Sequence, residues 1–536
     1  MLSSALSSRV ETPMAKILIT DGMAPEGIDI LKQAGHQVDS KKLTADELVK
    51  IIGEYDGLVV RSATQVTEKV LAAGAPALKV VGRAGVGVDN IDLPAATKVG
   101  VVAMNAPDGN TISAAEHTVG MIFATARMIP QAYAKLSGKG EWDKKSFTGV
   151  ELIGKTLGVV GLGKIGKHVA TICQAAGMNV IAFDPFLSPE VAKSLQIESV
   201  TVDDLLKRAD FVTLHTPLTE QTRNLINADR LKTMKKTARI VNVARGGIID
   251  EKALADALKA GIIGGAAIDV FEQEPIPADH PLIGVPNAII TPHLGASTEE
   301  AQTKVSVAIA QQFNAFFATG KIINAVNVQL RVDPAIDGYL LAAEQLGAAL
   351  VQTLDEPLTS LEVVAKGALS KYDTKPLAVA ALKGALAKIS TQTVNFVTVS
   401  TIAKERGISI TSSVSEQSEN GEQLVLKAVS KAGTHVLAGS IVAGQLRVLK
   451  YNEYPIDLPI GGHLLVMEYP DRPGMVGKYG SILGANSINI ARMEVSRIDG
   501  RGDALVILTL DDPISPAVFE EIKSNVKPTK AYRISL

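Results

Sequence analysis

A single cysteine, Cys173, is present among the 536 residues. One cysteine cannot form an intrachain disulfide, so a disulfide-stapled secreted protein is excluded and a reducing, cytoplasmic compartment is expected. Cys173 lies in a helical-looking segment, residues 167–173, in which a small apolar side chain is expected to be buried. We therefore interpret Cys173 as a packing residue and not as a reactive thiol.

An excess of charge is also absent, because 54 Lys and Arg residues face 56 Asp and Glu residues and leave a net charge of -2. This balance removes the broad attraction by which proteins bind nucleic acid or anionic membranes, so neither is expected as a partner. No uncharged apolar run approaches the ~20 residues that cross a bilayer. The Ser-rich residues 1–13 lack the apolar core of a signal peptide, and we interpret them as a ragged N-terminus with a second possible start at Met14 rather than as a targeting remnant.

Aromatic residues make up only 4% of the chain, and Trp142 is the only tryptophan. It lies in a polar loop, residues 137–148, that carries glycine and lysine. The ring is expected either at a contact between subunits or folded back onto its own domain, and the sequence favours neither.

Hydrophobic residues are plentiful, at 46% against 21% charged residues, so the chain is predicted to be globular with sizeable cores. At ~100–200 residues per domain, the length predicts roughly three to five domains. One catalytic module needs fewer, so part of the chain is expected to serve another purpose.

From Lys16 onward, short apolar runs alternate with helical stretches, a pattern typical of a parallel sheet. Between residues 155 and 292 the pattern continues in a second set of strand candidates. These lie at residues 156–160, 179–183, 211–214, 239–243, 265–269 and 288–291. Ligands of such sheets bind where the strands end, so the residues that follow these strands are the candidates for function.

The character of the chain changes after Asn327. Residues 332–457 combine Ala- and Leu-rich helices with polar strands and show no cluster of catalytic side chains. Pro455 and residues 459–462 have the composition of a linker. Residues 463–536 follow the order strand, helix, strand, strand, helix, strand, which predicts a small separate α+β unit.

A Gly-rich turn follows the strand at residues 156–160 and opens a helix. Gly161 permits a tight turn, Gly163 lets the backbone approach a pyrophosphate, and Gly166 lets the helix pack closely on the strand. Asp184 ends the next strand, at the distance where an acid accepts the ribose hydroxyls of a dinucleotide. Its carboxylate repels a 2′-phosphate, so the site is predicted to bind NAD and not NADP.

Three further strand ends carry side chains suited to hydride transfer from an alcohol carbon. His293 can take the hydroxyl proton, Arg245 can hold a neighbouring carboxylate, and Glu274 can keep the imidazole protonated in the reverse direction. Asp269 is placed nearer the nicotinamide. Taken singly these signals are weak, since His293 could cap a helix, Arg245 could pair with Asp250, and Glu274 could be a solvated loop acid.

The motifs taken together resemble the D-isomer-specific 2-hydroxyacid dehydrogenases over residues 16–327. They are GLGKIGK, HTPLT (215–219), NVARGGIID (242–250), DVFEQEP and TPHLGAST. The resemblance implies that Arg245, Glu274 and His293 are catalytic. It also implies that the cofactor is NAD, that no metal is needed, and that NAD is held by Val86, Gly161, Gly163, Lys164, Ile165, Gly166, Asp184, Thr216, Val243, Asp269 and Gly295.

Two segments, RSATQVT (61–67) and VGRAGVGVDNID (81–92), together with the C-terminal extension, are similar to family members that oxidise 3-phospho-D-glycerate. This similarity implies that Arg61 and Arg83 join Arg245 and His293 in binding the substrate. Arginine suits the task because its fork binds carboxylate and phosphate bidentately.

The tail at residues 463–536 resembles an ACT domain through the strand at 464–468, the turn at 471–474 and the segment 487–491. The resemblance implies an L-serine site formed by Tyr469, Asp471 and Asn489. The alternative is that Asp471 only caps the following helix and that the domain serves to dimerise.

The family resemblance implies four domains. They are a Rossmann-type NAD-binding domain (108–295), a discontinuous flavodoxin-like substrate domain (16–107 and 296–327), an α+β intervening domain (332–457) and a ferredoxin-like ACT domain (463–536). It further implies a homotetramer or at least a homodimer, in which basic residues such as Lys139, Lys144 or Lys145 reach a partner's site.

Two other functions stay open at this point. One is a dehydrogenase for glycerate, glyoxylate or another 2-hydroxy acid, with reduction of 2-oxoglutarate as a side reaction. The other is an NAD-sensing corepressor on the same fold, against which the ACT-like tail counts.

Overall fold

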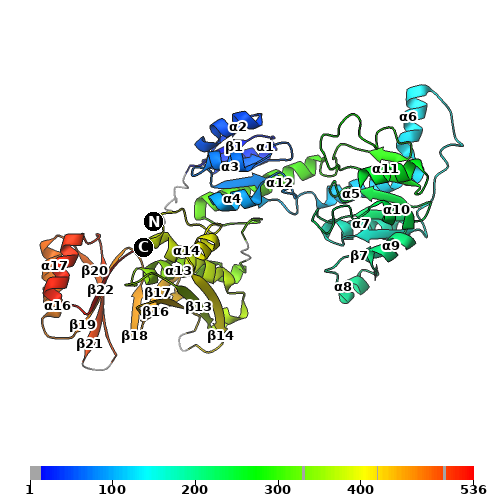
Figure 1. Cartoon of the computed structure of the whole chain (residues 1–536). Coiled ribbons are helices and arrows are strands. Elements are labelled where there is room, and N and C mark those ends of the chain that lie inside the picture. Colours follow the sequence, from blue (N-terminus) through cyan, green and yellow to red (C-terminus); the bar gives the residue numbers. More distant parts are fainter. Residues whose placement is uncertain (1–13, 329–331, 419–420, 499–501) are drawn as a thin grey trace, which may run out of the picture.

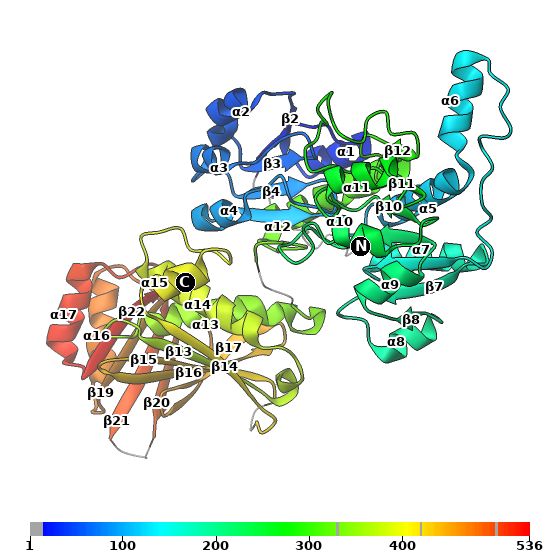
Figure 2. The same ribbon diagram turned by 45° about the vertical axis from the view of Figure 1, so that its right-hand side comes forward.

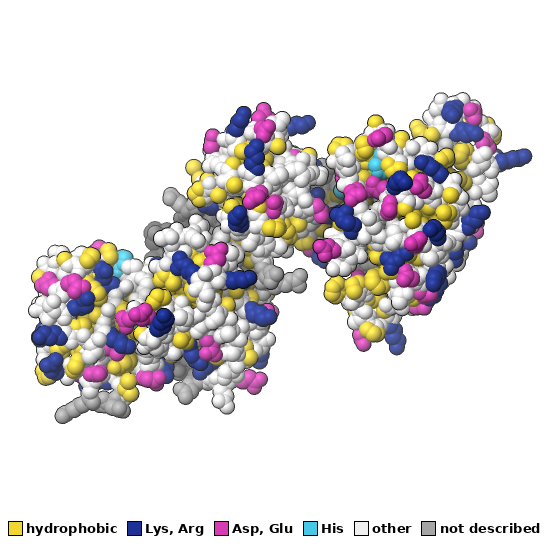
Figure 3. All heavy atoms as spheres, in the orientation of Figure 1, with side chains coloured by type: hydrophobic (Ala, Val, Ile, Leu, Met, Phe, Trp, Pro, Cys, Tyr) yellow, Lys and Arg dark blue, Asp and Glu magenta, His cyan; other side chains and the backbone are white. Residues whose placement is uncertain are grey.

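The computed structural model describes residues 14–328, 332–418, 421–498 and 502–536. The predicted ragged N-terminus, residues 1–13, lies outside them. Within the described residues the strands form four sheets, one in each expected domain (Figure 1). No helix of the described part is long and apolar enough to cross a membrane. Lys and Arg side chains are interspersed with Asp and Glu on the face shown in Figure 3, as the balanced composition implies.

The first sheet is parallel, with the strand order β2-β1-β3-β4-β5. Its strands are β1 (Lys16–Ile19), β2 (Gln37–Ser40), β3 (Gly57–Val60), β4 (Val80–Arg83) and β5 (Val102–Asn105). The helices are α1 (Pro25–Gln33), α2 (Ala45–Ile51), α3 (Glu68–Gly74) and α4 (Leu93–Val99). The middle strand β3 is buried along its whole length, because helices cover both faces of the sheet.

The helix α12 (Glu299–Thr319) returns to this first domain after the second domain has been completed. Its Val305, Ile309 and Phe313 are buried in one core with β1 and β4. Gly82 on β4 permits the contact, since a Cβ there would lie 2.9 Å from Ile309 Cγ2. The substrate domain is therefore discontinuous, as the family resemblance implies.

The second sheet is also parallel, with the order β12-β11-β10-β9-β6-β7-β8. Its strands are β6 (Thr156–Val160), β7 (Asn179–Phe183), β8 (Glu198–Ser199), β9 (Phe211–Leu214), β10 (Arg239–Asn242), β11 (Gly265–Ile268) and β12 (Ala288–Ile290). Six of these match the strands predicted from the sequence to within a residue. The edge strand β8 was not predicted, because its two exposed polar residues carry no apolar signal.

The order of the second sheet reverses between β6 and β9, and ligands of open α/β sheets bind at such a point. Its helices are α5 (Thr111–Arg127), α6 (Ile129–Lys139), α7 (Lys164–Ala175), α8 (Pro189–Ser194), α9 (Val202–Arg208), α10 (Ala228–Thr233) and α11 (Glu251–Lys259). Cys173 on α7 is buried, and burial raises the pKa of its thiol to about 12, as a packing residue requires.

The helix α6 stands away from the rest of its domain (Figures 1 and 2). None of its residues is buried, and its last residues fall where the sequence predicted the start of a polar loop. Trp142, just beyond the helix, is 80% exposed. In this chain the ring is thus not folded back onto its own domain.

The third sheet belongs to the intervening domain and has the order β14-β13-β15-β16-β17-β18. Its elements are α13 (Asp337–Val351), β13 (Ser360–Lys366), α14 (Lys375–Ile389), α15 (Val399–Glu405), β14 (Ser409–Ser415), β15 (Gln423–Ser430), β16 (Gly433–Val442), β17 (Gln445–Tyr451) and β18 (Tyr454–Pro459). Glycines let α13 and α14 pack backbone to backbone, since a Cβ at Gly384 would lie 1.9 Å from the Glu344 carbonyl oxygen.

The ACT-like domain follows the predicted element order. It consists of β19 (His463–Pro470), α16 (Met475–Ala485), β20 (Ile490–Arg497), β21 (Asp503–Leu510), α17 (Pro516–Val526) and β22 (Lys530–Ser535), and its sheet is antiparallel with the order β20-β21-β19-β22.

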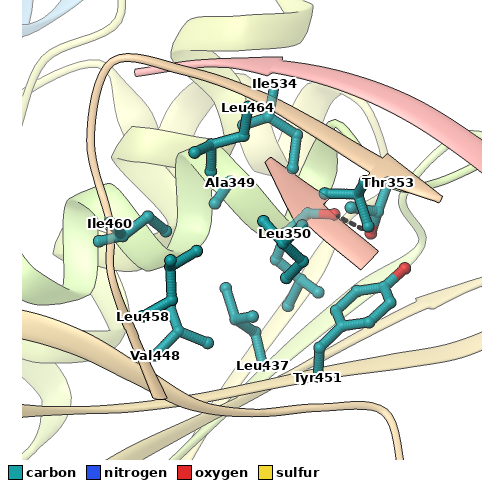
Figure 4. A pocket seen from close by; sticks show the side chains of 12 residues that line it. Ala349, Leu350, Thr353, Leu437, Val448, Tyr451, Leu458, Ile460, Leu464 and Ile534 are labelled. Carbon is teal, nitrogen blue, oxygen red and sulfur yellow. Dashed lines mark hydrogen bonds between the residues drawn. The ribbon is translucent and has the colours of Figure 1, made fainter. Parts of the chain in front are cut away.

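The predicted linker between these last two domains is mostly wrong, because Pro455 and Pro459 lie inside β18. Only residues 460–462 connect β18 to β19. The ACT-like unit is also not separate in its packing. Leu464 and Ile534 of its sheet share one core with Leu350 of α13 and Leu458 of β18 (Figure 4). The cavity left in this core is only about 20 Å³.

The intervening domain also contacts the substrate domain. Val397 is buried in the core that contains β1 and β4, and Asn395 donates a hydrogen bond of 2.7 Å to the Gly100 carbonyl. Gly100 ends α4 in the left-handed conformation, with φ +79°. The intervening domain thus packs against the same domain that contains Arg61 and Arg83.

Candidate active site

The Gly-rich turn after β6 has the geometry that its sequence predicts. Gly161 has φ +94°, and a Cβ there would lie 2.7 Å from the His215 carbonyl oxygen. A Cβ on Gly166 would lie 2.1 Å from the Gly161 carbonyl oxygen, so only glycine lets α7 start this close to the strand. The space beside Gly163 is open to 4 Å. The N-terminus of α7 therefore presents its amides to an unobstructed anion site.

Asp184 follows β7 and ties this turn to the next strand. Its Oδ2 accepts a hydrogen bond of 2.8 Å from the amide of Leu162, and its Oδ1 accepts one of 2.8 Å from the amide of Phe186. Each carboxylate oxygen has a further lone pair, so ribose hydroxyls can still donate to it. The neighbouring Lys164 instead forms an ion pair with Asp108.

His293 and Glu274 form a dyad, with 2.7 Å between His293 Nδ1 and Glu274 Oε2. The other Glu274 oxygen accepts a hydrogen bond of 3.0 Å from the amide of Phe271. The two side chains are 38% and 36% exposed, so the pair lies at a surface that a ligand can reach. With Nδ1 held by Glu274, the Nε2 atom of His293 is left to exchange a proton with a substrate.

The environment of Glu274 favours its carboxylate form. Burial alone would raise the pKa of Glu274, but the hydrogen bonds from His293 and from the Phe271 amide outweigh burial and leave the pKa below its usual value. Glu274 therefore stays negative near neutral pH and can stabilise an imidazolium on His293.

Asp269 lies behind this dyad rather than in the wall of the cavity. Its side chain is fully buried, and it accepts hydrogen bonds from Thr291 Oγ1 (2.6 Å) and the amides of Leu294 (2.8 Å) and Gly295 (2.9 Å). Burial raises its pKa, but these hydrogen bonds and the nearby His117, 3.3 Å away, outweigh burial and lower it. Asp269 thus holds the backbone on either side of His293, whose φ is +55°.

Arg245 follows β10 and is held from both domains. Its Nε donates a hydrogen bond of 2.9 Å to Asp89 Oδ2 of the substrate domain, and its Nη1 donates one of 2.6 Å to the Ala244 carbonyl. Asn242 fixes the turn by donating to the Arg245 carbonyl at 2.8 Å. A Cβ on Gly87 would lie 1.9 Å from Arg245 Nη2, so the glycine makes room for the guanidinium. The expected alternative pairing with Asp250 does not occur, because Asp250 caps α11.

Arg83 and Arg61 face Arg245 from the substrate domain. Burial first, and the charges of Arg245 and Arg61 after it, lower the pKa of Arg83 to about 10, while the nearby carboxylates oppose this shift. The Nε atom of Arg83 is buried without a hydrogen-bond partner. A buried, unpaired donor among three like charges is what an anionic ligand would satisfy.

These groups meet in one cavity of about 880 Å³. Of the residues predicted for the site, its walls contain Arg61, Arg83, Val86, Ile165, Thr216, Val243, Arg245, Glu274, His293 and Gly295. The remaining predicted cofactor residues lie outside its walls. They are Gly161, Gly163, Lys164, Gly166, Asp184 and Asp269.

Two residues near the cavity, Asn110 and Asp89, were missed from the sequence. Asn110 lines the cavity, and its Oδ1 is buried without a hydrogen-bond partner. The same holds for Oγ1 of Thr216, which the sequence did predict. Asn110 immediately precedes α5, and this position just before a helix was the only available signal. Asp89 was missed because its partner Arg245 is 156 residues away. The unpartnered oxygens and the Gly-rich turn fit a bound dinucleotide.

The residues expected to bind an effector lie in the ACT-like domain. Tyr469 is buried to 1% exposure, with its ring centroid 6.4 Å from that of Tyr479. Asp471 forms an ion pair with Arg497. Asn489 donates a hydrogen bond of 2.8 Å to Asp511. In the described residues no group of three or more His, Cys, Asp or Glu side chains could hold a metal ion.

The Gly-rich turn after β6 is typical of a site for a dinucleotide. A His–Glu dyad and arginines share one cavity beside it, and this combination is that of an NAD-dependent dehydrogenase. Comparisons with known proteins narrow this class. The D-isomer specific 2-hydroxyacid dehydrogenase NAD binding domain matches residues 119–295, the D-3-phosphoglycerate dehydrogenase intervening domain matches 335–451, and the ACT domain matches 463–526.

Relatives match the chain along nearly its full length. It is 45% identical to D-3-phosphoglycerate dehydrogenase of Synechocystis over 98% of this chain and 95% of the relative. It is 43% identical to the protein of the same name from Methanocaldococcus jannaschii, over 96% and 99%. The chain belongs to the D-3-phosphoglycerate dehydrogenase family. Among solved structures, D-lactate dehydrogenase from Aquifex aeolicus complexed with NAD and lactic acid is similar, at a TM-score of 0.52 and 26% identity over 58% of this chain and 98% of that one.

Proposed function

We propose that the protein oxidises 3-phospho-D-glycerate to 3-phosphohydroxypyruvate with NAD, the first step of phosphorylated L-serine synthesis. The observation that carries this proposal is the single cavity in which the His293–Glu274 dyad faces three arginines from two domains. A 2-hydroxy acid that also bears a phosphate has an anionic group at each end. A single arginine could pair with only one of these groups, whereas three arginines can pair with both.

In this reaction the substrate C2 loses a hydride and its hydroxyl loses a proton. NAD, held by the Gly-rich turn after β6 and by Asp184, would supply the hydride acceptor. Nε2 of His293 takes the proton, and Glu274 stabilises the resulting imidazolium through Nδ1. Arg245 holds the carboxylate and the oxygen that becomes the carbonyl, while Arg83 and Arg61 meet the phosphate. In the reverse direction the imidazolium returns its proton to that oxygen.

Substrate profiling tests the proposal. The protein should turn over 3-phospho-D-glycerate with a much higher kcat/KM than D-glycerate. Arg83→Leu should remove most of this preference by raising KM for the phosphorylated substrate, since a phosphate contact of this kind contributes about 1.5–3 kcal/mol. Equal turnover of the two acids by the unaltered protein would contradict the proposal.

We also propose that L-serine inhibits the protein through the ACT domain, with Asp471 receiving its ammonium group. Asp471 follows β19 and pairs with Arg497 through Oδ2, which leaves its other oxygen to accept a hydrogen bond from an ammonium group. L-serine should inhibit the full chain, and Asp471→Asn should weaken inhibition while kcat stays unchanged. Inhibition that is equal in both proteins would remove Asp471 from the effector site.

We further propose a cytoplasmic homotetramer, or at least a homodimer, that uses α6 and the following loop as a contact. Tyr133 and Trp142 there are 71% and 80% exposed, and a contact with a second subunit would remove these aromatic side chains from water. Lys139, Lys144 and Lys145 on this segment would then lie near a partner's cleft. Tyr133→Ser combined with Trp142→Ser should lower the mass measured by light scattering, and an unchanged mass would exclude this contact.

A further inference from the structure

The short segment Phe271–Glu272 contacts the loops of two residues with proposed catalytic roles, Arg245 and Glu274. A Cβ on Gly246 would lie 1.9 Å from the Phe271 carbonyl carbon, so the turn that carries Arg245 rests directly on this peptide. On the other side, the amide of Phe271 donates to Glu274 Oε1 at 3.0 Å. A shift of this short segment would therefore move Arg245 and Glu274 together.

Two ionisable residues outside the cavity fix the segment. Glu251, the first residue of α11, accepts a hydrogen bond of 2.7 Å from the amide of Glu272 through Oε1. Its Oε2 lies 2.7 Å from His280 Nε2. The two side chains are 15% and 6% exposed, and neither residue lines the cavity. The Glu251 carboxylate that accepts this hydrogen bond is therefore largely shielded from solvent and is fixed on its other side by His280.

His280 supports the same segment in two ways. The amide of Leu282 donates to His280 Nδ1 at 3.4 Å, so Nε2 carries a hydrogen and donates to Glu251. The ring also packs edge-on against Phe271, at 5.3 Å between centroids and 83° between planes. On the outer side, Arg223 Nη1 binds Glu272 Oε1 at 2.8 Å. The segment is thus held on two sides, and the Glu251–His280 pair is much less exposed than the Arg223–Glu272 pair.

We propose that Glu251 and His280 are positioning residues for hydride transfer, which hold the Phe271–Glu272 peptide so that Arg245 and Glu274 keep their productive geometry. The proposal rests on the function proposed above. Neither side chain lines the cavity. The effect is exerted through the amide of Glu272, and a displacement of about 1 Å at a reacting group can cost on the order of 10²-fold in rate.

Three variants test the role. Glu251→Gln keeps only one acceptor oxygen, whereas the carboxylate accepts from both the Glu272 amide and His280 Nε2. His280→Leu removes the imidazole donor but fills much of the space that the ring occupied. His280→Gln keeps a donor and serves as the conservative rescue. Lys252→Gln is the matched control, because Lys252 is the next residue on α11 and its side chain is 83% exposed.

The readouts are kcat for each NADH-binding site, the NADH dissociation constant, and the deuterium isotope effect on kcat with 3-phospho-D-glycerate labelled at C2. Glu251→Gln and His280→Leu should lower kcat by about 10- to 100-fold. The isotope effect should rise as hydride transfer becomes slower than product release, while NADH affinity changes less than about twofold. His280→Gln should recover most of the rate, and Lys252→Gln should match the unaltered protein.

A merely structural role would show itself differently. If the number of NADH-binding sites falls in proportion to activity, so that kcat for each site and the isotope effect are unchanged, the proposal is overturned. The same conclusion follows if both variants equal the unaltered protein. His293→Asn, assayed in parallel, separates the two failures: an active native protein with an inactive His293→Asn variant preserves the proposed function even when the positioning role is lost.

Discussion

The two halves of the chain join their domains in opposite ways. In residues 16–327 the two parallel sheets keep separate hydrophobic cores, and a cavity of about 880 Å³ lies where they face each other. In residues 332–536 two sheets contribute to one shared core that encloses about 20 Å³. Separate cores leave room for a ligand and polar groups between domains, whereas a shared core leaves room only for packing.

Apart from His293, Arg245 offers the largest expected effect, because its side chain pairs with Asp89 across the cleft between the two domains. Arg245→Ala should lower kcat/KM by about 10²–10³-fold or more, as removal of a group that stabilises developing charge does. Steady-state kinetics with 3-phospho-D-glycerate measures this loss. Arg208→Gln, which only breaks exposed ion pairs with Glu198 and Asp204, is the control. Retention of more than a tenth of the activity by Arg245→Ala would show that the arginine is not needed for chemistry.

The shared core can be tested with Leu350, which is 1% exposed on α13 and packs against the ACT sheet. Leu350→Ala should destabilise the C-terminal half by about 2–5 kcal/mol and leave kcat unchanged below its unfolding transition. Calorimetry should show the intervening and ACT domains unfolding together. Leu341→Ala, at a 61% exposed position on the same helix, should have little effect. Two separate transitions for the two domains would mean that the core does not couple them.

Much of the fold could be predicted because the catalytic half consists of short buried strands with turn signals between them. The strand β6 and the glycines after it were recognisable because local backbone geometry selects the residue type at each position. Gly161, for example, has φ +94°, a conformation that favours glycine. The seam between β18 and the ACT sheet was not predictable. Proline and glycine at residues 455–462 signal a break in the backbone pattern but carry no information on which faces pack together.

In the candidate site, too, the residues with a local sequence signal could be predicted, and those placed by the packing of the two domains could not. Arg245, Glu274 and His293 follow successive strands of one sheet, so topology alone brings them to one edge. Asp89 and Asn110 could not be found in this way, because their role depends on how the two domains face each other. Local sequence specifies each strand end, while the cleft arises only from the complete arrangement.

His435 offers a smaller effect that is confined to the C-terminal half. Its side chain is 5% exposed and lies beside Thr353 and the rings of Tyr451 and Tyr532. Burial is the main cause that lowers the pKa of His435, and the positive charge of Lys530 adds to it. The negative charge of Asp355 opposes this shift. The unfolded chain therefore binds a proton first as the pH falls. The stability contributed by neutral His435 is complete above about pH 6.5 and is lost as the pH falls toward the lowered value.

His435→Gln should consequently flatten the dependence of the unfolding free energy on pH below about 6.5, measured by denaturant titration of the C-terminal transition. His168→Gln, at an exposed position on α7, should leave that dependence as it is. An unchanged slope in the His435 variant would show that this histidine does not couple protonation to the shared core.

Cys173 offers the smallest effect. With its thiol buried and its pKa raised to about 12, it is not a thiolate at neutral pH. Cys173→Ala should retain full kcat and lose only about 1 kcal/mol of stability, and alkylating reagents should leave the folded protein active. Rapid inactivation by such a reagent, prevented in the Cys173→Ala variant, would contradict the packing role.

The central claim is that His293 removes the hydroxyl proton during hydride transfer from 3-phospho-D-glycerate. Its most direct test is a single turnover of His293→Asn saturated with NAD, followed by NADH absorbance and compared with the unaltered protein. We expect NADH to form about 10²–10⁴-fold more slowly in His293→Asn, with NAD affinity nearly unchanged. NADH formed at the rate of the unaltered protein would contradict it.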